Sequence, residues 1–487
     1  MLFNSLDFAA FLALVACGYH LCPIRWRRWY LLASSYLFYF TWSVGFASLL
    51  LAVTGVAFVL AKRIADRQDE RVRRQLLAVA VVVLLLPLLA LKYLGQLSFG
   101  LIQNPHGGAW VSFLPSGVAA VGISYYTFKL ISYVVDVYWQ RIEPCHEFGS
   151  VAIFAAFFPQ ILSGPIQRAG DFLGQIQNLE ATRPELIASG LRLMLFGFFK
   201  KLVVADRLGV VVDPVFTHPH QWSGSVLALG SYLFAIQLYA DFSGITDIAI
   251  GAGRVLGFHS PPNFDSPFYA ENIQDFWRRW HMSLTSWLTD YVFMPLRMAS
   301  RDWGQLGLVA SLVINMVAVG VWHGAAWTFV AFGLIHASYM AVLSLTLRRR
   351  KRFLQQRPVL QRMHRFIGPL ITFNLVVVSL IFFRAADLSD AWYILSHACE
   401  GVLGSVARVA HRGVEHGVWG LSHLRWSPGD VVVVFGAALI MEAVHLLQRL
   451  KVAVDLPLVR WAGYFALGFA ILLWGESGSK QFIYVRF

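Results

Sequence analysis

The sequence predicts an all-α, polytopic integral membrane protein with a single membrane domain over residues 1–487. Hydrophobic residues make up 57% of the chain and charged residues only 14%, and the mean hydropathy is +0.59. Apolar runs recur from end to end, and no long polar segment separates them into soluble domains. Basic clusters stand at the ends of these runs, as they do in the cytoplasmic loops of membrane proteins.

The apolar runs give the expected elements in chain order. A crossing helix needs about 20 apolar residues, so we expect about ten to twelve crossings and assign the shorter runs to re-entrant or interfacial helices. No positively charged segment precedes the first run, which predicts an uncleaved helix and not a signal peptide. The runs lie at residues 6–22, 29–41, 44–61, 76–94, 116–138, 150–163, 187–205, 224–240, 243–257, 307–320, 323–346, 367–383, 430–447 and 460–475.

Charge predicts the orientation of the chain and argues against several classes of protein. The basic clusters at 25–28, 62–74 and 348–365 are expected in the cytoplasm, which places the N-terminus and the loop at 385–428 on the outer side. The net charge of +13 gathers at the ends of spans and forms no continuous face, so nucleic-acid binding is not expected. The four cysteines show no CxxC and no Cys/His ligand spacing, so we expect neither a disulfide framework nor a metal site.

His323 stands inside the most apolar part of the chain. Residues 307–346 would reach roughly 60 Å as one helix, about twice the hydrocarbon core, so the run must break into two spans. Gly320 and Gly324 bracket the expected break. A titratable group beside irregular backbone at membrane depth indicates a functional site, but a core histidine bonded to a backbone carbonyl explains the position equally well. A neutral, buried His323 has the chemistry of a general base, whereas His336 lies well round the helix and is expected to be structural.

Residues 263–297 predict an amphipathic helix that lies in the membrane interface, because Trp, Tyr and Arg recur there at high density. Asn272 is its expected N-cap, with an acidic residue three positions on, in a variant of the capping box. His281 is expected on the flank of this helix, where the spacing alone favours a structural, hydrogen-bonded imidazole. Asp290 is expected to pair with an arginine such as Arg297.

Motifs of other chemistries are missing from the sequence. It contains no GxSxG elbow, no Walker A loop and no HExxH motif. Gly251, Gly253 and Gly257 follow the spacing GxGxxxG, which differs from the dinucleotide-binding pattern, and they lie in an apolar run. Small residues at such positions are expected to allow close packing of helices.

Ordered motifs along nearly the whole chain resemble the membrane-bound O-acyltransferase (MBOAT) family, and within it the alginate O-acetyltransferase branch. Each motif alone is only suggestive, but together and in this order they are specific. They are MLFNS at residues 1–5, GISYYTFKLISYVVDVYW at 122–139, FFPQILSGPIQ at 157–167, QLYADFSGITDIAIGA at 237–252, NFDSPF at 263–268, FWRRWHMSLTSWLTDYVFMPL at 276–296, VWHGAAWTFVAFGLIH at 321–336, FFRA at 382–385 and QFIYVRF at 481–487.

The resemblance implies that residues 263–346 carry the active-site core. It implies that His323 is the catalytic histidine, a neutral base that deprotonates an acceptor hydroxyl for attack on a thioester carbonyl. His281 is implied as the second active-site position, where it orients the acyl donor or hydrogen-bonds its carbonyl oxygen.

The same resemblance implies a set of supporting residues. Asp290 and Trp322 carry over as residues that support the site. The oxyanion donors cannot be identified from the sequence; Asn315 and a free backbone N–H near Gly324 are the two candidates. The chain departs from the family pattern at Arg297, where relatives often carry glycine, so the shape of that loop stays open.

The family fold implies helices around a central tunnel in the bacterial inner membrane. An acyl thioester, with acetyl-CoA as the expected donor, enters from the cytoplasm, and no permanently bound cofactor is implied. The acetyl group is expected to pass outward to periplasmic SGNH-like acetyltransferases and to polysaccharide biosynthesis and secretion proteins. Alginate is the expected polymer, and cellulose or another exopolysaccharide is the alternative. The residues do not identify the immediate acceptor as a protein serine or a sugar hydroxyl.

Two other classes of function remain open at this stage. A polytopic transporter or proton-coupled channel would use His281 and His323 as relay groups. Such a protein needs several acidic side chains within its spans, and only Asp136, Asp241 and Asp247 come close. A non-catalytic scaffold of an exopolysaccharide secretion complex would not need the two histidines, yet both are present.

Overall fold

The computed structural model describes residues 1–94, 122–400, 428–450 and 456–476, and these residues form helices and connecting turns without a strand. They belong to two compact units: the described residues within 1–194 and 245–262 form unit 1, and those within 195–244 and 263–476 form unit 2. The expectation of a single domain stays a prediction. The start of the run at 116–138, most of the loop at 385–428 and the motif at 481–487 lie outside the described residues.

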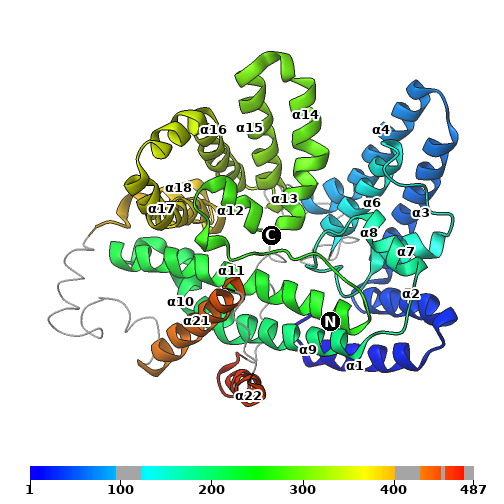
Figure 1. Ribbon diagram of the computed structural model, residues 1–487, viewed down its shortest axis with the longest axis horizontal. Helices are drawn as coiled ribbons and strands as arrows, with labels where there is room; N and C mark the ends of the chain where they lie inside the picture. Colours follow the sequence, from blue (N-terminus) through cyan, green and yellow to red (C-terminus); the bar gives the residue numbers. More distant parts are fainter. Residues whose placement is uncertain (95–121, 401–427, 451–455, 477–487) are drawn as a thin grey trace, which may run out of the picture. The chain divides into compact units, whose positions relative to one another are not determined.

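Several helices of unit 1 begin at a polar side chain that caps the first turn. The hydroxyl oxygens of Ser5 and Ser43 accept hydrogen bonds from the backbone N–H groups of Phe8 and Phe46, which satisfies the ends of α1 and α3. Helices α3, α4 and α6 pack side by side (Figure 1). In chain order the helices are α1 (Leu6–Leu21), α2 (Ile24–Phe40), α3 (Val44–Asp66), α4 (Glu70–Leu89), the π-helix η1 (Ala90–Leu94), α6 (Ile123–Tyr138), α7 (Phe148–Ala156) and α8 (Ala169–Gln177).

The glycines at 251–257 permit a close approach of two helices in unit 1. Helices α9 (Pro184–Phe198) and α11 (Gly224–Val255) both begin in one unit and end in the other. A Cβ atom on Gly251 would lie only 2.6 Å from the carbonyl oxygen of Gly190 on α9. No larger residue fits there, so the expected role of these small residues in helix packing is confirmed at Gly251.

Unit 2 carries the remaining helices and both motif histidines. Helix α15 packs along α16, and α16 packs along α17 (Figure 1). After α9 the elements are η3 (Phe199–Ala205), α10 (Asp206–Thr217), η4 (Pro219–Gln221), η5 (Pro267–Tyr269), α12 (Ile273–Arg279), α13 (Met282–Leu288), η6 (Thr289–Phe293), α14 (Met294–Ala299), η7 (Arg301–Trp303), α15 (Gly304–His323), α16 (Trp327–Gln355), α17 (Pro358–Arg384), α18 (Leu388–His397), α21 (Pro428–Arg449) and α22 (Pro457–Trp474).

The expected division between residues 224–240 and 243–257 is wrong, because α11 runs unbroken through both. Asp241 lies in the gap between the two expected runs. In the structure its carboxylate is buried and lies 2.7 Å from the ammonium of Lys201 on η3. A paired carboxylate is tolerated inside the helix bundle, so the helix has no reason to end there.

The run at 307–346 breaks as expected, although at a slightly different place. Helix α15 ends at His323 and α16 begins at Trp327, so the break covers residues 324–326. Gly320 lies inside α15, where a Cβ atom would overlap the carbonyl oxygen of Phe329 on α16. Gly320 therefore serves the close packing of the two helices and does not form the break.

The single interfacial helix expected over residues 263–297 is wrong. The segment forms α12, α13, η6 and α14, and the chain turns between α12 and α13 at Trp280 and His281. The expected N-cap is confirmed, because the side-chain oxygen of Asn272 accepts a hydrogen bond of 3.0 Å from the N–H of Asp275.

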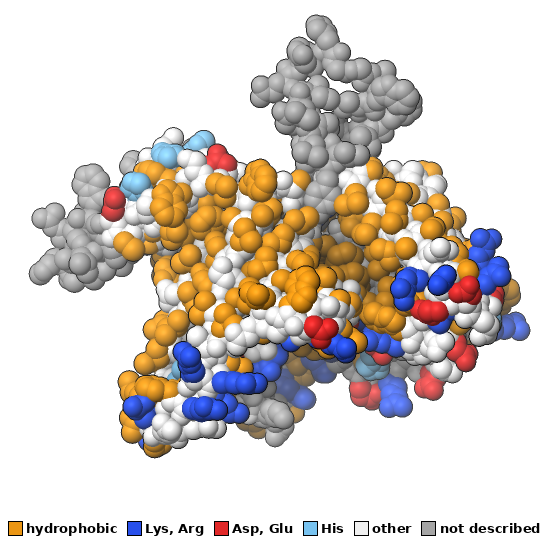
Figure 2. Space-filling model, turned by 90° about the horizontal axis from the view of Figure 1, so that it is seen from above, with side chains coloured by type: hydrophobic (Ala, Val, Ile, Leu, Met, Phe, Trp, Pro, Cys, Tyr) orange, Lys and Arg blue, Asp and Glu red, His pale blue; other side chains and the backbone are white. Residues whose placement is uncertain are grey.

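The lengths and composition of the helices confirm a multi-pass membrane protein of the all-α class. Within the described residues, eight helices are long and apolar enough to cross a membrane. The total of ten to twelve crossings stays a prediction. Hydrophobic side chains cover much of the face drawn in Figure 2, and Lys and Arg gather in the lower half and at the right of the view. The eight helices are Val44–Asp66, Glu70–Lys92, Gly224–Val255, Arg301–His323, Trp327–Gln355, Pro358–Arg384, Gly429–Leu447 and Pro457–Trp474.

Candidate active site

Both motif histidines of unit 2 lie where a helix ends or begins. His323 is the last residue of α15, and His281 is the N-cap of α13. Both side chains are buried, with relative exposures of 5% and 1%. The backbone of His281 is left-handed, with φ of +42°, a conformation that costs a non-glycine residue about 1–3 kcal/mol. The surrounding contacts must hold this turn in place.

The loop before α12 supplies the contacts that hold the His281 turn. The N–H of Met282 donates to the carbonyl oxygen of Asn263 at 2.9 Å, and the N–H of Asp265 donates to the carbonyl oxygen of Arg279 at 3.0 Å. These two backbone bonds lie on either side of His281. They fasten the turn to the segment that runs from Asn263 to Asp265, earlier in the chain.

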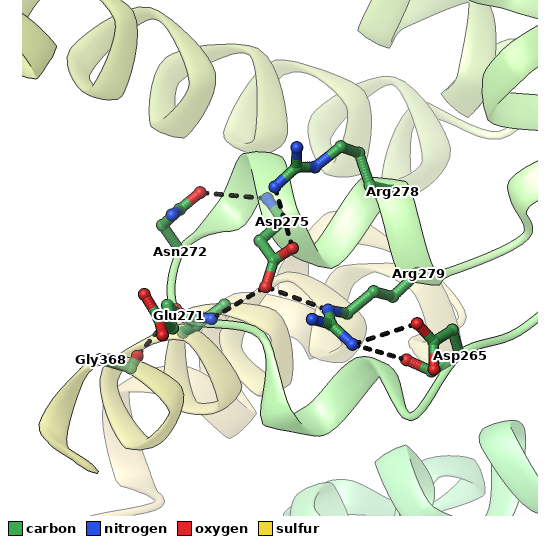
Figure 3. Close-up of polar contacts among 8 residues, drawn as sticks. Asp265, Glu271, Asn272, Asp275, Arg278, Arg279 and Gly368 are labelled. Atoms are coloured by element: carbon green, nitrogen blue, oxygen red, sulfur yellow. Dashed lines mark hydrogen bonds and ion pairs between the residues drawn. The ribbon is translucent and has the colours of Figure 1, made fainter. Parts of the chain in front are cut away.

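A network of charged side chains surrounds the same loop (Figure 3). Arg279 donates through Nε to Asp275 at 3.0 Å and through a terminal nitrogen to Asp265 at 3.3 Å. The Asp275 carboxylate also accepts from the N–H of Glu271 and from Arg278. Arg279 thus ties the start of α12 to the loop that carries Asn263, and α12 leads directly into the His281 turn.

The imidazole of His281 has one bonded nitrogen and one without a partner. Its Nδ1 donates to the side-chain oxygen of Asn263 at 3.1 Å, and its buried Nε2 has no hydrogen-bond partner in the part of the chain that the structure describes. The ring of Phe242 stands perpendicular to the imidazole at a centroid distance of 4.7 Å. Burial lowers the pKa of His281 to about 3, so its imidazole is neutral at ordinary pH.

The imidazole of His323 is surrounded by aromatic rings from three helices. The rings of Trp322 and Phe383 both lie 4.8 Å from it, and those of Phe329 and Phe332 lie 6.0 and 6.1 Å away. These residues come from α15, α16 and α17. Their close contact excludes water from much of the ring and leaves a low-dielectric site, in which a positioned polar group acts strongly.

Trp322 joins the two histidines into one site. Its buried ring lies 5.6 Å from that of His281 and 4.8 Å from that of His323. The two imidazoles can therefore be no farther apart than the sum of these distances. The structure brings together His281, Trp322 and His323, three of the residues that the sequence singled out.

The other expected site residues lie farther along their helices. Asn315 is buried on α15, two turns or roughly 12 Å before His323, and among the described residues its Oδ1 has no hydrogen-bond partner. The N–H of Gly324 already donates to the carbonyl oxygen of Val321, so it is not a free oxyanion donor. Asp290 is half-buried in η6, and its supporting role stays a prediction. Arg297 donates to the carbonyl oxygen of Ser300.

His336 has the structural role that its position suggested. Its Nδ1 accepts from the indole N–H of Trp277 at 3.2 Å, and its Nε2 donates to the hydroxyl of Ser379 at 2.9 Å. That hydroxyl donates onward to the carbonyl oxygen of Val376. Both ring nitrogens are satisfied, and the chain of bonds ties α12 to α16 and α17.

The sequence did not single out Asn263, whose side chain contacts His281 in the structure. It begins one of the family motifs, but its contact with His281 depends on a turn whose geometry the sequence does not show. Phe242 and Phe383 were likewise read as parts of apolar runs, not as walls of a site. No group of three or more His, Cys, Asp or Glu residues able to hold a metal occurs within the described residues.

Comparison with known proteins identifies the class to which this site belongs. The model of the MBOAT, membrane-bound O-acyltransferase family matches residues 144–381, a range that contains both histidines. The chain is 34% identical to "Probable alginate O-acetylase AlgI" of Azotobacter vinelandii over 398 residues, which cover 80% of this chain and 77% of that protein. The protein therefore belongs to the membrane-bound O-acyltransferase family, and it is an acyltransferase.

Further relatives within this family carry two different names. A protein of Pseudomonas aeruginosa, also named "Probable alginate O-acetylase AlgI", is 34% identical over 80% of this chain and 74% of its own length. The "Peptidoglycan O-acetyltransferase" of Helicobacter pylori is 31% identical over 81% of this chain and 79% of its own length. The expected resemblance to the alginate branch is confirmed. The name of the Helicobacter pylori relative adds peptidoglycan as a second polymer.

Proposed function

We propose that this protein transfers acetyl groups from a thioester donor toward the O-acetylation of a secreted polysaccharide, with alginate as the first candidate polymer. The observation that carries the proposal is the buried contact of His281, Trp322 and His323 at the ends of two helices. The names of the relatives support acetyl as the transferred group and alginate as the polymer. The match to the peptidoglycan enzyme makes that polymer the second candidate.

In the proposed reaction His323 is the general base. Its neutral imidazole takes the proton of an acceptor hydroxyl while the oxygen bonds to the carbonyl carbon of the thioester. The tetrahedral intermediate then collapses, the C–S bond breaks, and the imidazolium returns the proton to the leaving thiolate. A general base contributes about 10²–10⁴-fold to the rate, so positioning of the substrates in the buried site must supply the rest.

The direction of transfer follows from the charge at the helix ends. Arg348, Arg349, Arg350, Lys351 and Arg352 are exposed at the end of α16. By the positive-inside rule we place this end in the cytoplasm and the N-terminus in the periplasm of a bacterial inner membrane. Acetyl-CoA is the proposed donor, because its phosphates suit this basic side. The proposed recipients on the other side are periplasmic SGNH-like transferases and the polysaccharide machinery.

A test in cells separates these proposals from the alternatives. The acetyl content of each secreted polymer and of peptidoglycan is measured in strains that carry wild-type protein, His323→Ala or the exposed control His220→Ala at matched membrane levels. We expect His323→Ala to abolish acetylation of one polymer without reducing its export, and the control to have no effect. Unchanged acetylation contradicts the catalytic role of His323, and loss of export supports a transporter or scaffold. Loss of acetyl from peptidoglycan alone replaces alginate by the second candidate.

A further inference from the structure

The side-chain oxygen of Asn263 accepts three hydrogen bonds at the His281 turn. The donors are the backbone N–H of Ser283 at 3.1 Å, the hydroxyl of Ser283 at 2.8 Å and Nδ1 of His281 at 3.1 Å. A backbone N–H can only donate, so the atom that faces it must be the amide oxygen and not the amide nitrogen. The contact with Ser283 therefore sets the orientation of the Asn263 amide independently of His281.

The orientation of Asn263 determines which nitrogen of His281 carries the proton. Because an amide oxygen only accepts, Nδ1 of His281 must be protonated. In a neutral imidazole the other nitrogen, Nε2, then has a lone pair and no hydrogen. Neutral His281 therefore accepts a hydrogen bond through Nε2 and has no proton to give to a carbonyl oxygen. This excludes one of the two roles expected for it, the donation of a hydrogen bond to the thioester carbonyl.

Two buried polar atoms of this pair are left without partners in the described residues. They are Nε2 of His281, an acceptor, and Nδ2 of Asn263, a donor. Their residues are each only 1% exposed. A buried polar atom without a partner costs about 1–3 kcal/mol, and a substrate group that bonds to it removes that cost. The described residues therefore leave one hydrogen-bond acceptor and one donor of this pair for a substrate. His281 also contacts Trp322, which contacts His323, so the pair belongs to the same site.

We propose that Asn263 is a positioning residue that holds His281 in its Nδ1–H tautomer, so that Nε2 accepts a hydrogen bond from an O–H or N–H group of the substrate. This inference rests on the proposed acyl transfer at His281 and His323. It gives the two histidines different roles. His323 takes the proton of the reacting hydroxyl, and His281 orients the donor or acceptor by accepting a hydrogen bond from another of its O–H or N–H groups. Loss of the correct histidine tautomer is known to lower enzyme rates severely.

The test has two measurements: NMR determines the tautomer of His281, and kinetic assays of variants determine its effect on acyl transfer. The full chain, labelled with ¹⁵N-histidine and reconstituted in nanodiscs, is studied by NMR, and the His281 signals are assigned by their loss in His281→Gln. We expect a protonated Nδ1 and a bare Nε2 in the wild type. The matched control Ser283→Ala removes one bond to Asn263 but leaves its contact with His281, so it should keep this spectrum.

Two variants of Asn263 link the tautomer to the rate. Asn263→Leu keeps a similar size but accepts no hydrogen bond, so we expect mixed tautomers and a fall in kcat of about 100-fold with little change in KM. Asn263→Asp keeps an acceptor for all three donors and should restore most of the rate. Its carboxylate stabilises the imidazolium of His281, so the acidic limb of the kcat/KM profile should move to higher pH.

Specific outcomes overturn the inference. A wild-type His281 protonated at Nε2 contradicts it, and so does a folded Asn263→Leu protein that keeps both the single tautomer and the wild-type kcat. Failure of the proposed function gives a different result: the wild-type protein then transfers no acyl group, or His323→Ala transfers it at the wild-type rate, whatever the tautomer of His281.

Discussion

The buried charges of Lys201, Asp206 and Asp241 provide a test of how unit 2 is held together. The Lys201 ammonium lies 2.8 Å from Asp206 and 2.7 Å from Asp241, and all three side chains are at most 5% exposed. The substitution Lys201→Met removes the only cation of this triad and leaves two carboxylates buried. Breaking a buried pair in this way costs about 3–5 kcal/mol. For a chain of this length the shift is about 1 °C per kcal/mol, so Tm should fall by about 3–5 °C.

The assay is thermal unfolding of the purified chain in detergent, followed by tryptophan fluorescence. The triple variant Lys201→Met, Asp206→Asn, Asp241→Asn should recover most of the lost stability, because no buried carboxylate then lacks a cation. As a control, Arg301→Met breaks a surface pair with Asp302, whose side chains are 78% and 84% exposed, and should change Tm little. A Lys201→Met protein as stable as the wild type, or a triple variant no better than the single one, refutes the reasoning.

Three further predictions test other parts of the structure. Burial lowers the pKa of His281 from its ordinary value of 6.5 to about 3, so the unfolded chain binds more protons between these pH values. Stability should therefore fall, by on the order of 1 kcal/mol per pH unit, as pH drops through this window, and the Tm-against-pH curve of His281→Gln should lack this slope. Gly320→Leu should lower Tm and the yield of folded protein, because its side chain meets the Phe329 carbonyl, whereas a Gly55→Leu control, with nothing within 4 Å of its Cβ position, should be tolerated. Asn272→Ala should destabilise by about 0.5–2 kcal/mol through loss of the α12 cap, and Asn272→Ser should restore most of it in the same unfolding assay.

The sequence predicts those parts of the fold that depend on local pattern and length. The apolar runs give the positions of the long helices, because a span must be both apolar and about 20 residues long. The length of the run at 307–346 requires the break beside His323, and the spacing of Asn272 and Asp275 predicts the start of α12. These features need no knowledge of distant contacts.

The parts that the sequence did not predict depend on residues far apart in the chain. The expected runs on either side of Asp241 form one helix, and the carboxylate inside it pairs with Lys201, which is forty residues away on another helix. The left-handed turn at His281 is held by hydrogen bonds to Asn263. A helical pattern of apolar and polar residues cannot predict such a contact. Three of the five expected site residues, His281, Trp322 and His323, lie close together, and the catalytic roles of all five stay predictions.

The most direct measurement of the central claim is acyl transfer by the purified protein. Wild-type protein and the variants His323→Gln and His220→Gln are reconstituted in proteoliposomes with labelled acetyl-CoA inside and the acceptor partner outside, and the transfer rate is measured. We expect His323→Gln to lose about 10²–10⁴-fold in rate, the contribution of a general base, and His220→Gln to match the wild type. A His323→Gln protein that transfers acetyl groups at the wild-type rate contradicts the assignment of His323 as the catalytic base.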